Sequence, residues 1–451
     1  MDFKTYPEYK STKFPWIGDL PVDWDVRRLK EVGQLFAGAG FPHEYQNVQG
    51  EELYFYKVGD LNLSENGKTL LASPHSISKE TAKVLRATII PKDSIVYAKI
   101  GAALLLNRRR MTTAECCIDN NMTAYVANAE EVTPEWAFYW LSTIDFGEHV
   151  NPGAIPSFSE GYQSVLPIPI PPLHEQQAIA RFLDFKTTQI DALIAKKLAL
   201  LDKLAEKRTA LISHAVTKGL DPSVPMKDSG VEWLGQIPAN WATKRLRFLT
   251  TMGGGMTPST SAPDYWNGDI PWITPKDMKR EALDGSIDML TDKAVAETGI
   301  RLHETGRVLI VVRGMILAHT FPVAINTVPA TVNQDMKALS SSLNHQYLAF
   351  LLKGIQGLIL SLSEESAHGT KVLRTDVFKN ISLPVPPYEE QEEIVRKIHE
   401  LTTRLDDQRK AVESAIDRLR EYRSALVTNA VTGKVDVREF RSPLNTAGAA
   451  T

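Results

Sequence analysis

The chain has 451 residues, of which 43% are hydrophobic, and its formal net charge is −3. Chains longer than about 300 residues exceed what one hydrophobic core organises, so we expect two to three domains. The balance of 51 basic against 54 acidic residues lacks the strongly basic composition of a simple nucleic-acid-binding protein. The charge balance excludes a nucleic-acid-binding protein that is basic over its whole surface. It does not exclude a local basic stripe that binds nucleic acid together with partner subunits.

The cysteines and the apolar runs exclude further classes of protein. Cys116 and Cys117 are the only cysteines and are adjacent, which suits neither a disulfide framework nor a CxxC metal site. Residues 1–10 carry mixed charges, and no run of 18 or more apolar residues occurs. We therefore expect a cytoplasmic location, with neither export nor membrane insertion.

An internal repeat is the strongest feature of the sequence and sets the expected architecture. A W-x-G-x-[LI]-P-x-x-W box begins at Trp16 and again at Trp233, 217 residues later. A P-P-x-x-E-Q motif begins at Pro171 and again at Pro386, 215 residues later. In each box Gly and Pro favour a turn that two indole rings pack onto the following strand, and we favour this structural role over stacking on a base.

Residues 1–171 are expected to form a mixed α/β domain, because short β-rich runs such as Ser94–Lys99 occur there without helical periodicity. The segment Phe36–Gly40 has the F-x-G-x-G pattern of adenine methyltransferase loops, but no [DN]-P-P-[YF] catalytic loop accompanies it. Gly253–Gly255 stands at the equivalent place in the second half. A turn repeated in both halves is the simpler interpretation.

Residues 172–220 are expected to form a long helix. Pro172 and Glu175 suit its first turn, and Gly219 is typical of a helix end. Apolar residues recur every seven positions, a heptad pattern typical of a helix that packs on another helix. The predicted seam consists of Leu183, Ile190, Leu204 and Leu211, with Ile179, Leu193 and Leu200 in the alternating positions.

Residues 221–386 are expected to form a second mixed α/β domain on the scaffold of the first. Asp119–Met122 matches Asn333–Met336, and Tyr97–Gly101 matches Val311–Gly314. Between these matches the two sequences diverge. A shared scaffold with different variable stretches is what we expect of a protein that reads two different half-sites.

Residues 387–436 are expected to form a second long helix, whose natural partner is the first, and residues 437–451 a flexible tail. A continuous seven-residue seam matches another helix better than a globular surface. Each fully buried Leu or Ile contributes ~1.5 to 3 kcal/mol, which outweighs a few polar interruptions. The predicted seam of the second helix is Ile398, Leu405, Val412, Leu419 and Leu426.

The duplicated boxes, the duplicated P-P-x-x-E-Q helix starts and the A-V-T endings at Ala215–Thr217 and Ala430–Thr432 resemble type I restriction-modification specificity subunits. The resemblance spans essentially the whole chain. It implies an α+β fold in pseudo-two-fold tandem repeat, with two target-recognition domains joined by two long helices that form an antiparallel coiled coil. It also implies an asymmetric, bipartite target on double-stranded DNA, with a spacer set by helix length.

The same resemblance implies a non-catalytic chain that guides enzymatic partners. Two modification subunits would supply S-adenosylmethionine-dependent methylation, and restriction subunits would supply ATP- and Mg-dependent translocation and cleavage. The chain has no G-x-x-x-x-G-K-[ST] loop and no H-E-x-x-H spacing among its ten histidines. We therefore expect no catalytic residue, metal or cofactor in this chain.

Basic residues near the β-rich variable stretches are the candidate DNA contacts. Arginine can read guanine for ~1 to 3 kcal/mol of discrimination, whereas most basic contacts position phosphates. A third to a half of the candidates are expected to be solvated surface charges. The candidates are Lys57, Lys99, Arg108, Arg109 and Arg110 in the first domain, and Lys276, Lys279, Arg280, Arg313, Lys371 and Arg374 in the second.

A protein of another class remains as the alternative interpretation. A non-catalytic coiled-coil scaffold with two protein- or glycan-binding modules would carry the same repeat, and the near-neutral charge favours it. Neighbouring genes for a methyltransferase and a helicase-nuclease would decide against that scaffold.

Overall fold

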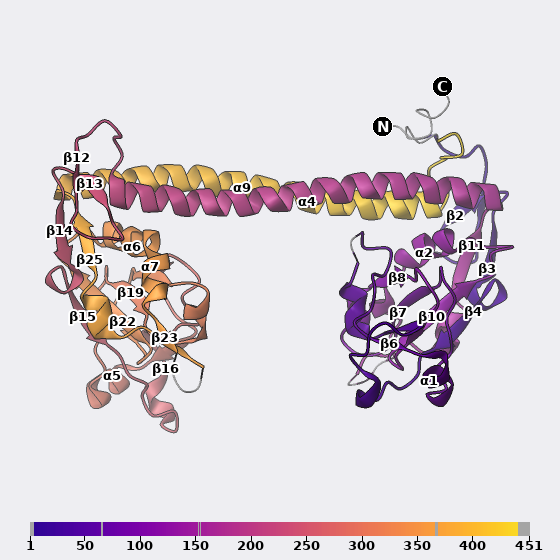
Figure 1. The fold of residues 1–451 in the computed structure, drawn as a ribbon, viewed down its shortest axis with the longest axis horizontal. Helices are drawn as coiled ribbons and strands as arrows, with labels where there is room; N and C mark the ends of the chain where they lie inside the picture. The colour runs from indigo at the N-terminus through magenta and orange to yellow at the C-terminus, as the bar shows by residue number, and fades with distance from the viewer. Residues whose placement is uncertain (1–3, 65, 152, 154, 366–368, 441–451) are drawn as a thin grey trace. The chain divides into compact units, whose positions relative to one another are not determined.

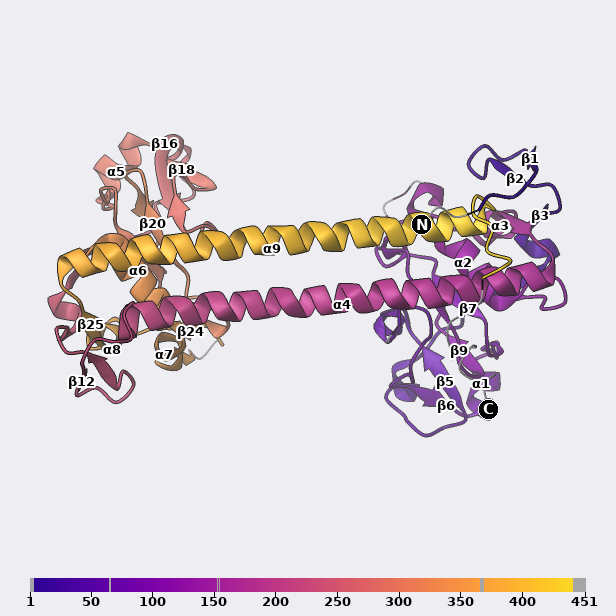
Figure 2. The same ribbon diagram turned by 90° about the horizontal axis from the view of Figure 1, so that it is seen from above.

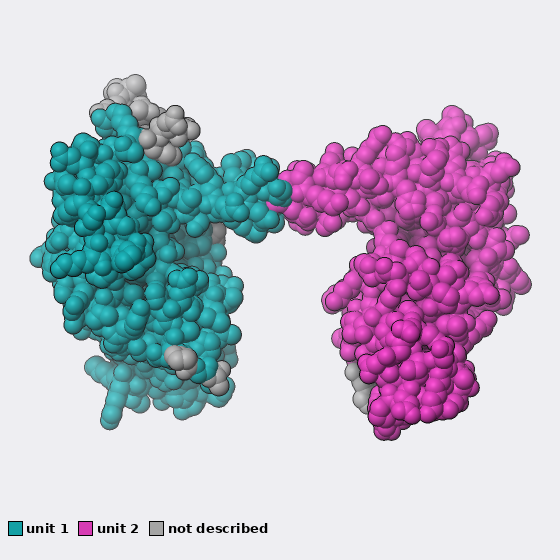
Figure 3. Space-filling model, turned by 180° about the vertical axis from the view of Figure 1, so that it is seen from behind, with its two compact units in different colours: residues 1–198, 414–451 teal, residues 199–413 magenta. Residues whose placement is uncertain are grey.

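The computed structural model describes residues 4–64, 66–151, 153, 155–365 and 369–440. They form two compact units, residues 1–198 with 414–451 (unit 1) and residues 199–413 (unit 2), coloured teal and magenta in Figure 3. Each unit holds one globular domain and one half of each long helix. Domain 1 is the part of unit 1 before the first long helix, and domain 2 is the part of unit 2 between the two long helices. The long helices are α4 (Leu173–Lys218) and α9 (Tyr388–Val431).

Domain 1 is built on a four-stranded antiparallel sheet in the order β4-β10-β7-β8, whose strands are labelled in Figure 1. It also contains a three-stranded sheet in the order β6-β5-β9. The four residues of β7 are all buried, as expected for an apolar run at the centre of a sheet. In chain order the elements are β1 (Tyr9–Ser11), β2 (Asp19–Pro21), β3 (Asp25–Arg28), β4 (Gly33–Ala37), β5 (Leu53–Tyr56), β6 (Ser76–Ile77), α1 (Lys79–Val84), β7 (Ile95–Ala98), β8 (Arg109–Met111), β9 (Cys116–Ile118), β10 (Met122–Ala127), α2 (Pro134–Ser142), α3 (Glu160–Ser164) and β11 (Pro167–Ile170).

Domain 2 repeats this plan with a five-stranded sheet in the order β15-β22-β19-β20-β17 and a three-stranded sheet in the order β18-β16-β21. In chain order its elements are β12 (Met226–Asp228), β13 (Gln236–Pro238), β14 (Ala242–Arg245), β15 (Thr250–Gly254), β16 (Trp266–Ile273), β17 (Ala282–Leu283), β18 (Asp288–Leu290), α5 (Asp292–Thr298), β19 (Val308–Val311), β20 (Val323–Asn326), β21 (Thr331–Val332), β22 (Met336–Ser341), α6 (His345–Gly354), α7 (Gln356–Ser361), β23 (Glu364–Glu365), β24 (Lys371–Val372), α8 (Thr375–Lys379) and β25 (Ser382–Val385). The predicted pair of mixed α/β domains is confirmed.

The two repeated motifs contact each other in each unit. The fully buried indole of Trp24 donates from Nε1 to Glu175 Oε1 at 3.2 Å, and that of Trp241 donates to Glu390 Oε1 at 2.8 Å. These glutamates belong to the two P-P-x-x-E-Q helix starts. The expected structural role of the boxes is therefore confirmed for their second tryptophan. The first, Trp16, is half exposed and stacks on Trp140 at 5.5 Å.

The glycines shared by both halves have a structural role, but the predicted turn is wrong, because Gly38 and Gly255 directly follow the strands β4 and β15 and neither has a positive φ. A Cβ at Gly38 would lie 1.9 Å from the carbonyl oxygen of Asp119, and one at Gly255 would lie 1.7 Å from that of Val332. Both strands pass so close to a neighbouring backbone that only glycine fits there. The resemblance of Phe36–Gly40 to a cofactor loop therefore reflects strand packing.

The helices α4 and α9 lie side by side within each unit (Figure 2). In unit 1 Arg423 pairs with Asp191 through hydrogen bonds of 2.9 and 3.1 Å, and in unit 2 Arg208 lies 3.9 Å from Asp406. A residue later in α4 thus meets a residue earlier in α9, which is the antiparallel pairing expected from the resemblance.

The predicted seam is buried at some positions and half-buried at others. Leu193 and Leu200 are 48% and 42% exposed, so their placement in the seam was wrong. A helix of 3.6 residues per turn drifts by ~20° per heptad from a strict seven-residue repeat, which rotates such positions outward. The buried members are Leu183, Ile190, Ile398, Leu405 and Leu426, and the half-buried ones are Leu204, Leu211, Val412 and Leu419.

The second long helix ends earlier than predicted, at Val431 and not at residue 436. Gly433 turns the chain with a φ of 67°, after which the backbone N–H of Asp436 donates to Lys4 O at 2.8 Å. Val437 is buried and Phe440 packs on Phe185, so the predicted flexible tail is wrong for residues 437–440. Residues 441–451 lie outside the described part of the chain. Among the described helices, none combines the length and apolar character of a membrane span.

Candidate nucleic-acid interface

Three of the basic candidates in domain 2 are brought together by two adjacent backbone segments. Gly314 N donates to Lys371 O at 3.0 Å, and Leu373 N donates to Val312 O at 2.8 Å. Arg313 pairs with Val372 as an isolated β-bridge between these bonds. Arg313, just after β19, therefore lies beside the segment that carries Lys371 and Arg374, and we name these three residues the Arg313 cluster.

Carboxylates neutralise part of the Arg313 cluster. Lys371 Nζ lies 3.1 Å from Glu365, and Arg374 lies 2.7 Å from Asp376. The hydrogen bond from Arg374 lowers the pKa of the Asp376 carboxyl. Arg313 is exposed, and its guanidinium forms no ion pair with any residue that the structure describes. Arg313 is thus the member of the cluster best placed to meet a phosphate or a base edge.

The other candidates in domain 2 follow β16. Thr274 N donates to Asp277 Oδ2 at 2.8 Å and forms a turn that leaves Lys276, Lys279 and Arg280 exposed. Arg280 is engaged with Asp284 at 2.7 Å. Within the described ranges, no hydrogen bond or ion pair joins this turn to the Arg313 cluster.

Domain 1 places Lys57 and Lys99 at strand ends, where both are half-buried. Lys57 Nζ donates to Gln46 Oε1 at 2.9 Å. Phe158 N donates to Lys99 O at 2.8 Å, the bond that Leu373 N makes to Val312 O in domain 2. The counterpart of Arg313 in domain 1 is therefore the residue after Lys99, the exposed Ile100.

The three consecutive arginines at 108–110 are not equivalent. Arg109 is 5% exposed, its guanidinium bonds to the carbonyl of Ile144, and it lies 3.8 Å from the ring centre of Phe146. Burial lowers its pKa to about 10. Arg109 holds the fold together, and its prediction as a DNA contact is wrong. Arg110 donates to Gly67 O at 2.9 Å, and both it and Arg108 are half-buried.

Exposed apolar side chains beside these basic positions were not anticipated. Met315 follows the Arg313 cluster and is 63% exposed, and Leu106 lies in the corresponding loop of domain 1 with 56% exposure. The sequence offered one signal, the apolar run Ala102–Leu106, which fits neither a helical nor a strand period. Such side chains suit contact with thymine methyl groups.

The described residues hold no group of three or more His, Cys, Asp or Glu side chains placed to bind a metal. Cys116 and Cys117 are buried thiols, and burial raises the pKa of Cys117 to about 11. A thiol with so high a pKa is a poor nucleophile at neutral pH. The residues grouped in the two domains are suited to binding.

Two copies of one domain, which present exposed apolar side chains in both copies and exposed basic side chains in domain 2, define a duplicated binding protein. The family model for the type I restriction modification DNA specificity domain matches residues 21–203 and again residues 238–414. The chain is similar to the EcoR124I/EcoR124II specificity subunit of Escherichia coli, with 31% identity over 65% of this chain and 71% of the relative. It is also similar to the putative MjaX specificity subunit of Methanocaldococcus jannaschii, with 20% identity over 97% and 99%.

Solved structures show the same fold. A chain from a type I restriction-modification system matches with a TM-score of 0.68 at 15% identity, covering 91% of this chain and 98% of that one. The HsdS subunit of Thermoanaerobacter tengcongensis matches with a TM-score of 0.50 at 16% identity, covering 92% and 98%. The chain belongs to the family of type I restriction-modification specificity subunits, the non-catalytic components that determine which DNA sequence the complex recognises. These matches do not favour the scaffold with protein- or glycan-binding modules.

Proposed function

We propose that each domain reads one half of an asymmetric, bipartite target on double-stranded DNA, and that the paired helices set the spacer between the halves. The observation that carries the proposal is the difference between the two domains at equivalent exposed positions. Domain 1 presents Ile100 beside Ser157, whereas domain 2 presents Arg313 beside Val372 on the same backbone bridge. Different side chains on one scaffold favour different base sequences.

We propose further that two modification subunits dock on the helices and that restriction subunits complete the complex in the cytoplasm. Exposed apolar side chains in the middle of α4, including Leu193 and Leu200, support a docking role. S-adenosylmethionine would belong to the modification subunits, and ATP and Mg²⁺ to the restriction subunits. The residues of this chain would bind and orient the DNA.

The test is methylome sequencing of a host that expresses this chain with its modification partner, compared with a host that expresses the partner alone. We expect a gapped, adenine-methylated motif with two different halves in the first host and not in the second. A stable complex with an active partner that adds no new motif would contradict the proposal and favour the scaffold interpretation. A symmetric motif would contradict the assignment of different halves to the two domains.

A further inference from the structure

Lys68 and Glu281 occupy the same backbone position in the two domains but carry opposite charges. Lys68 O accepts from Met111 N at 2.7 Å, and Glu281 O accepts from Ile325 N at 2.9 Å. The following residues, Thr69 and Ala282, form matching parallel bridges to Met111 and Ile325. The repeated hydrogen bonds establish the equivalence independently of the side chains.

In unit 1 the lysine connects domain 1 to a long helix. Lys68 Nζ lies 2.5 Å from Asp184 Oδ1 of α4, and the same carboxylate oxygen accepts from the Tyr139 hydroxyl at 2.5 Å. The Lys68 ammonium also lies 4.9 Å from the centre of the Tyr139 ring. The side chain of Lys68 is 17% exposed, so solvent screens this ion pair only in part. The contacts line a cavity of about 500 Å³ between α4, α9 and domain 1.

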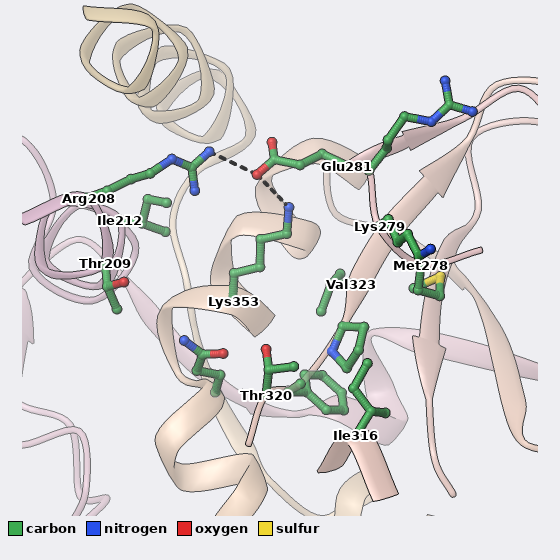
Figure 4. A pocket seen from close by; sticks show the side chains of 14 residues that line it. Arg208, Thr209, Ile212, Met278, Lys279, Glu281, Ile316, Thr320, Val323 and Lys353 are labelled. Atoms are coloured by element: carbon green, nitrogen blue, oxygen red, sulfur yellow. Dashed lines mark hydrogen bonds and ion pairs between the residues drawn. The ribbon is translucent and has the colours of Figure 1, made fainter. Parts of the chain in front are cut away.

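In unit 2 the glutamate makes the corresponding connection with reversed polarity. Glu281 Oε1 lies 2.9 Å from Arg208 of α4 and 3.0 Å from Lys353 of α6, as Figure 4 shows. Burial alone would raise the pKa of Glu281, but Lys353 and Arg208 outweigh it and hold the pKa below its ordinary value. Glu281 therefore stays ionised, pairs with Lys353 inside domain 2 and joins the domain to α4 through Arg208.

Residues 215 positions apart in the sequence occupy equivalent places in α4 and α9. This equivalence explains which charged side chain of the helices lies next to each domain. Arg208 corresponds to Arg423, and both pair with an aspartate of the other helix. Asp184, the partner of Lys68, corresponds to His399, so unit 2 has no carboxylate at that place. A lysine at the domain position would meet Arg208 in unit 2, and a glutamate would meet Asp184 in unit 1. Like charges at these distances repel. Arg423 lines the same cavity of unit 1, but Asp191 already binds its guanidinium through two hydrogen bonds.

We propose that Lys68 and Glu281 are positioning residues that fix each recognition domain on its own half of the helix pair and thereby hold the two half-sites at one spacing. The inference about spacing rests on the proposed function. Each domain carries the charge that is complementary to the helix residues of its own unit. The two domains therefore cannot be exchanged between the units without losing an ion pair. A domain moved to the other place would need the opposite charge at this position.

The test compares four full-length chains, each assembled with the modification partner. They are the wild type, Lys68→Glu, the restored pair Lys68→Glu/Asp184→Lys, and the control Lys92→Glu, which reverses an exposed charge in the same domain. The melting temperature measures how much the ion pair between Lys68 and Asp184 stabilises the chain. Methylation rates on targets with the natural spacer, and with spacers one base pair longer or shorter, report domain position. A purely structural role would lower the melting temperature without changing the spacer preference.

We expect Lys68→Glu to lower the melting temperature by about 3 to 6 °C and the preference for the natural spacer by roughly tenfold, and the restored pair to recover most of both. Lys92→Glu should match the wild type. The inference is overturned if Lys68→Glu behaves like Lys92→Glu, if the double variant stays as defective as the single one, or if only the melting temperature changes. A wild-type chain that directs no methylation would overturn the proposed function instead.

Discussion

The two domains share their backbone hydrogen bonds and differ in the side chains that those bonds present to solvent. Gly101 N donates to Pro156 O at 2.8 Å in domain 1, and Gly314 N donates to Lys371 O at 3.0 Å in domain 2. Proline stands at this position in one domain and lysine in the other, although the bond is the same. Buried apolar residues and paired backbone groups thus maintain the scaffold, while exposed positions can diverge without unfolding it.

The buried tryptophan of each box offers the largest test of this equivalence. We expect Trp24→Ala and Trp241→Ala each to cost about 3 to 5 kcal/mol in the free energy of unfolding, because each removes a fully buried indole and its bond to a helix-start glutamate. Urea denaturation followed by limited proteolysis will show which unit opens. Trp16→Ala, at a half-exposed ring, should cost much less; an equal cost would contradict the assigned roles.

The close-packed glycines test whether the repeated glycine segment is structural in both domains. Gly38→Ala and Gly255→Ala should each destabilise the chain by about 1 to 3 kcal/mol, because the new methyl group would overlap a backbone carbonyl. Gly40→Ala is the matched control, since a Cβ at that residue would meet nothing within 4 Å. Chemical denaturation measures all three. If Gly38→Ala is as stable as Gly40→Ala, the close approach does not constrain the sequence.

Arg313 in domain 2 and Ile100 in domain 1 occupy equivalent positions. Substitutions of these two residues test whether the domains bind DNA differently. Arg313→Ala should reduce the slope of log affinity against log salt by about 1 if the guanidinium contacts a phosphate, or cost ~1 to 3 kcal/mol of discrimination if it contacts a base. Ile100→Ala should leave the salt dependence unchanged. DNA titrations of the assembled complex at several salt concentrations measure both. No effect of Arg313→Ala on either quantity would remove it from the interface.

The smallest expected effect concerns pH and Glu281. Because its folded-state pKa lies below the ordinary value of 4.5, Glu281 stabilises unit 2 above that value, and this contribution is lost as the pH falls through the folded pKa. Glu281→Gln should therefore lose less stability than the wild type on acidification from about pH 5. Melting temperatures across that range test the difference, with Glu232→Gln at an exposed position as control. Parallel pH profiles for all three chains would contradict the assignment.

Much of the fold could be predicted from the sequence, because residues that recur in both halves identify positions on which the structure depends. The heptads predicted both long helices, and the two boxes and the P-P-x-x-E-Q motifs predicted two equivalent domains. The seam could not be followed through Leu193 and Leu200, because small drifts in helix phase accumulate along the sequence. Gly433 marks the early end of the second helix locally, whereas the path of the residues after it depends on contacts with residues near the start of the chain, which no local pattern reveals.

The DNA contacts were the least predictable part of the protein. Arg109 is indistinguishable in sequence from its neighbours Arg108 and Arg110, yet its side chain is buried against the carbonyl of Ile144 and the ring of Phe146, which only the tertiary fold brings near. Lys68 and Glu281 escaped notice because their equivalence depends on sheet hydrogen bonds within stretches where the two domains diverge. Charge in a sequence identifies residues that could meet DNA, but tertiary contacts decide which of them are available.

The central claim is that the two domains read different halves of one target, and methylome sequencing of a domain-specific variant tests it most directly. Hosts would express the modification partner with either the wild-type chain or Arg313→Ala/Arg374→Ala. We predict that the variant relaxes or loses sequence preference in one half of the gapped motif and keeps the other half and the spacer. A change in both halves, or in neither, would contradict the division of recognition between the two domains.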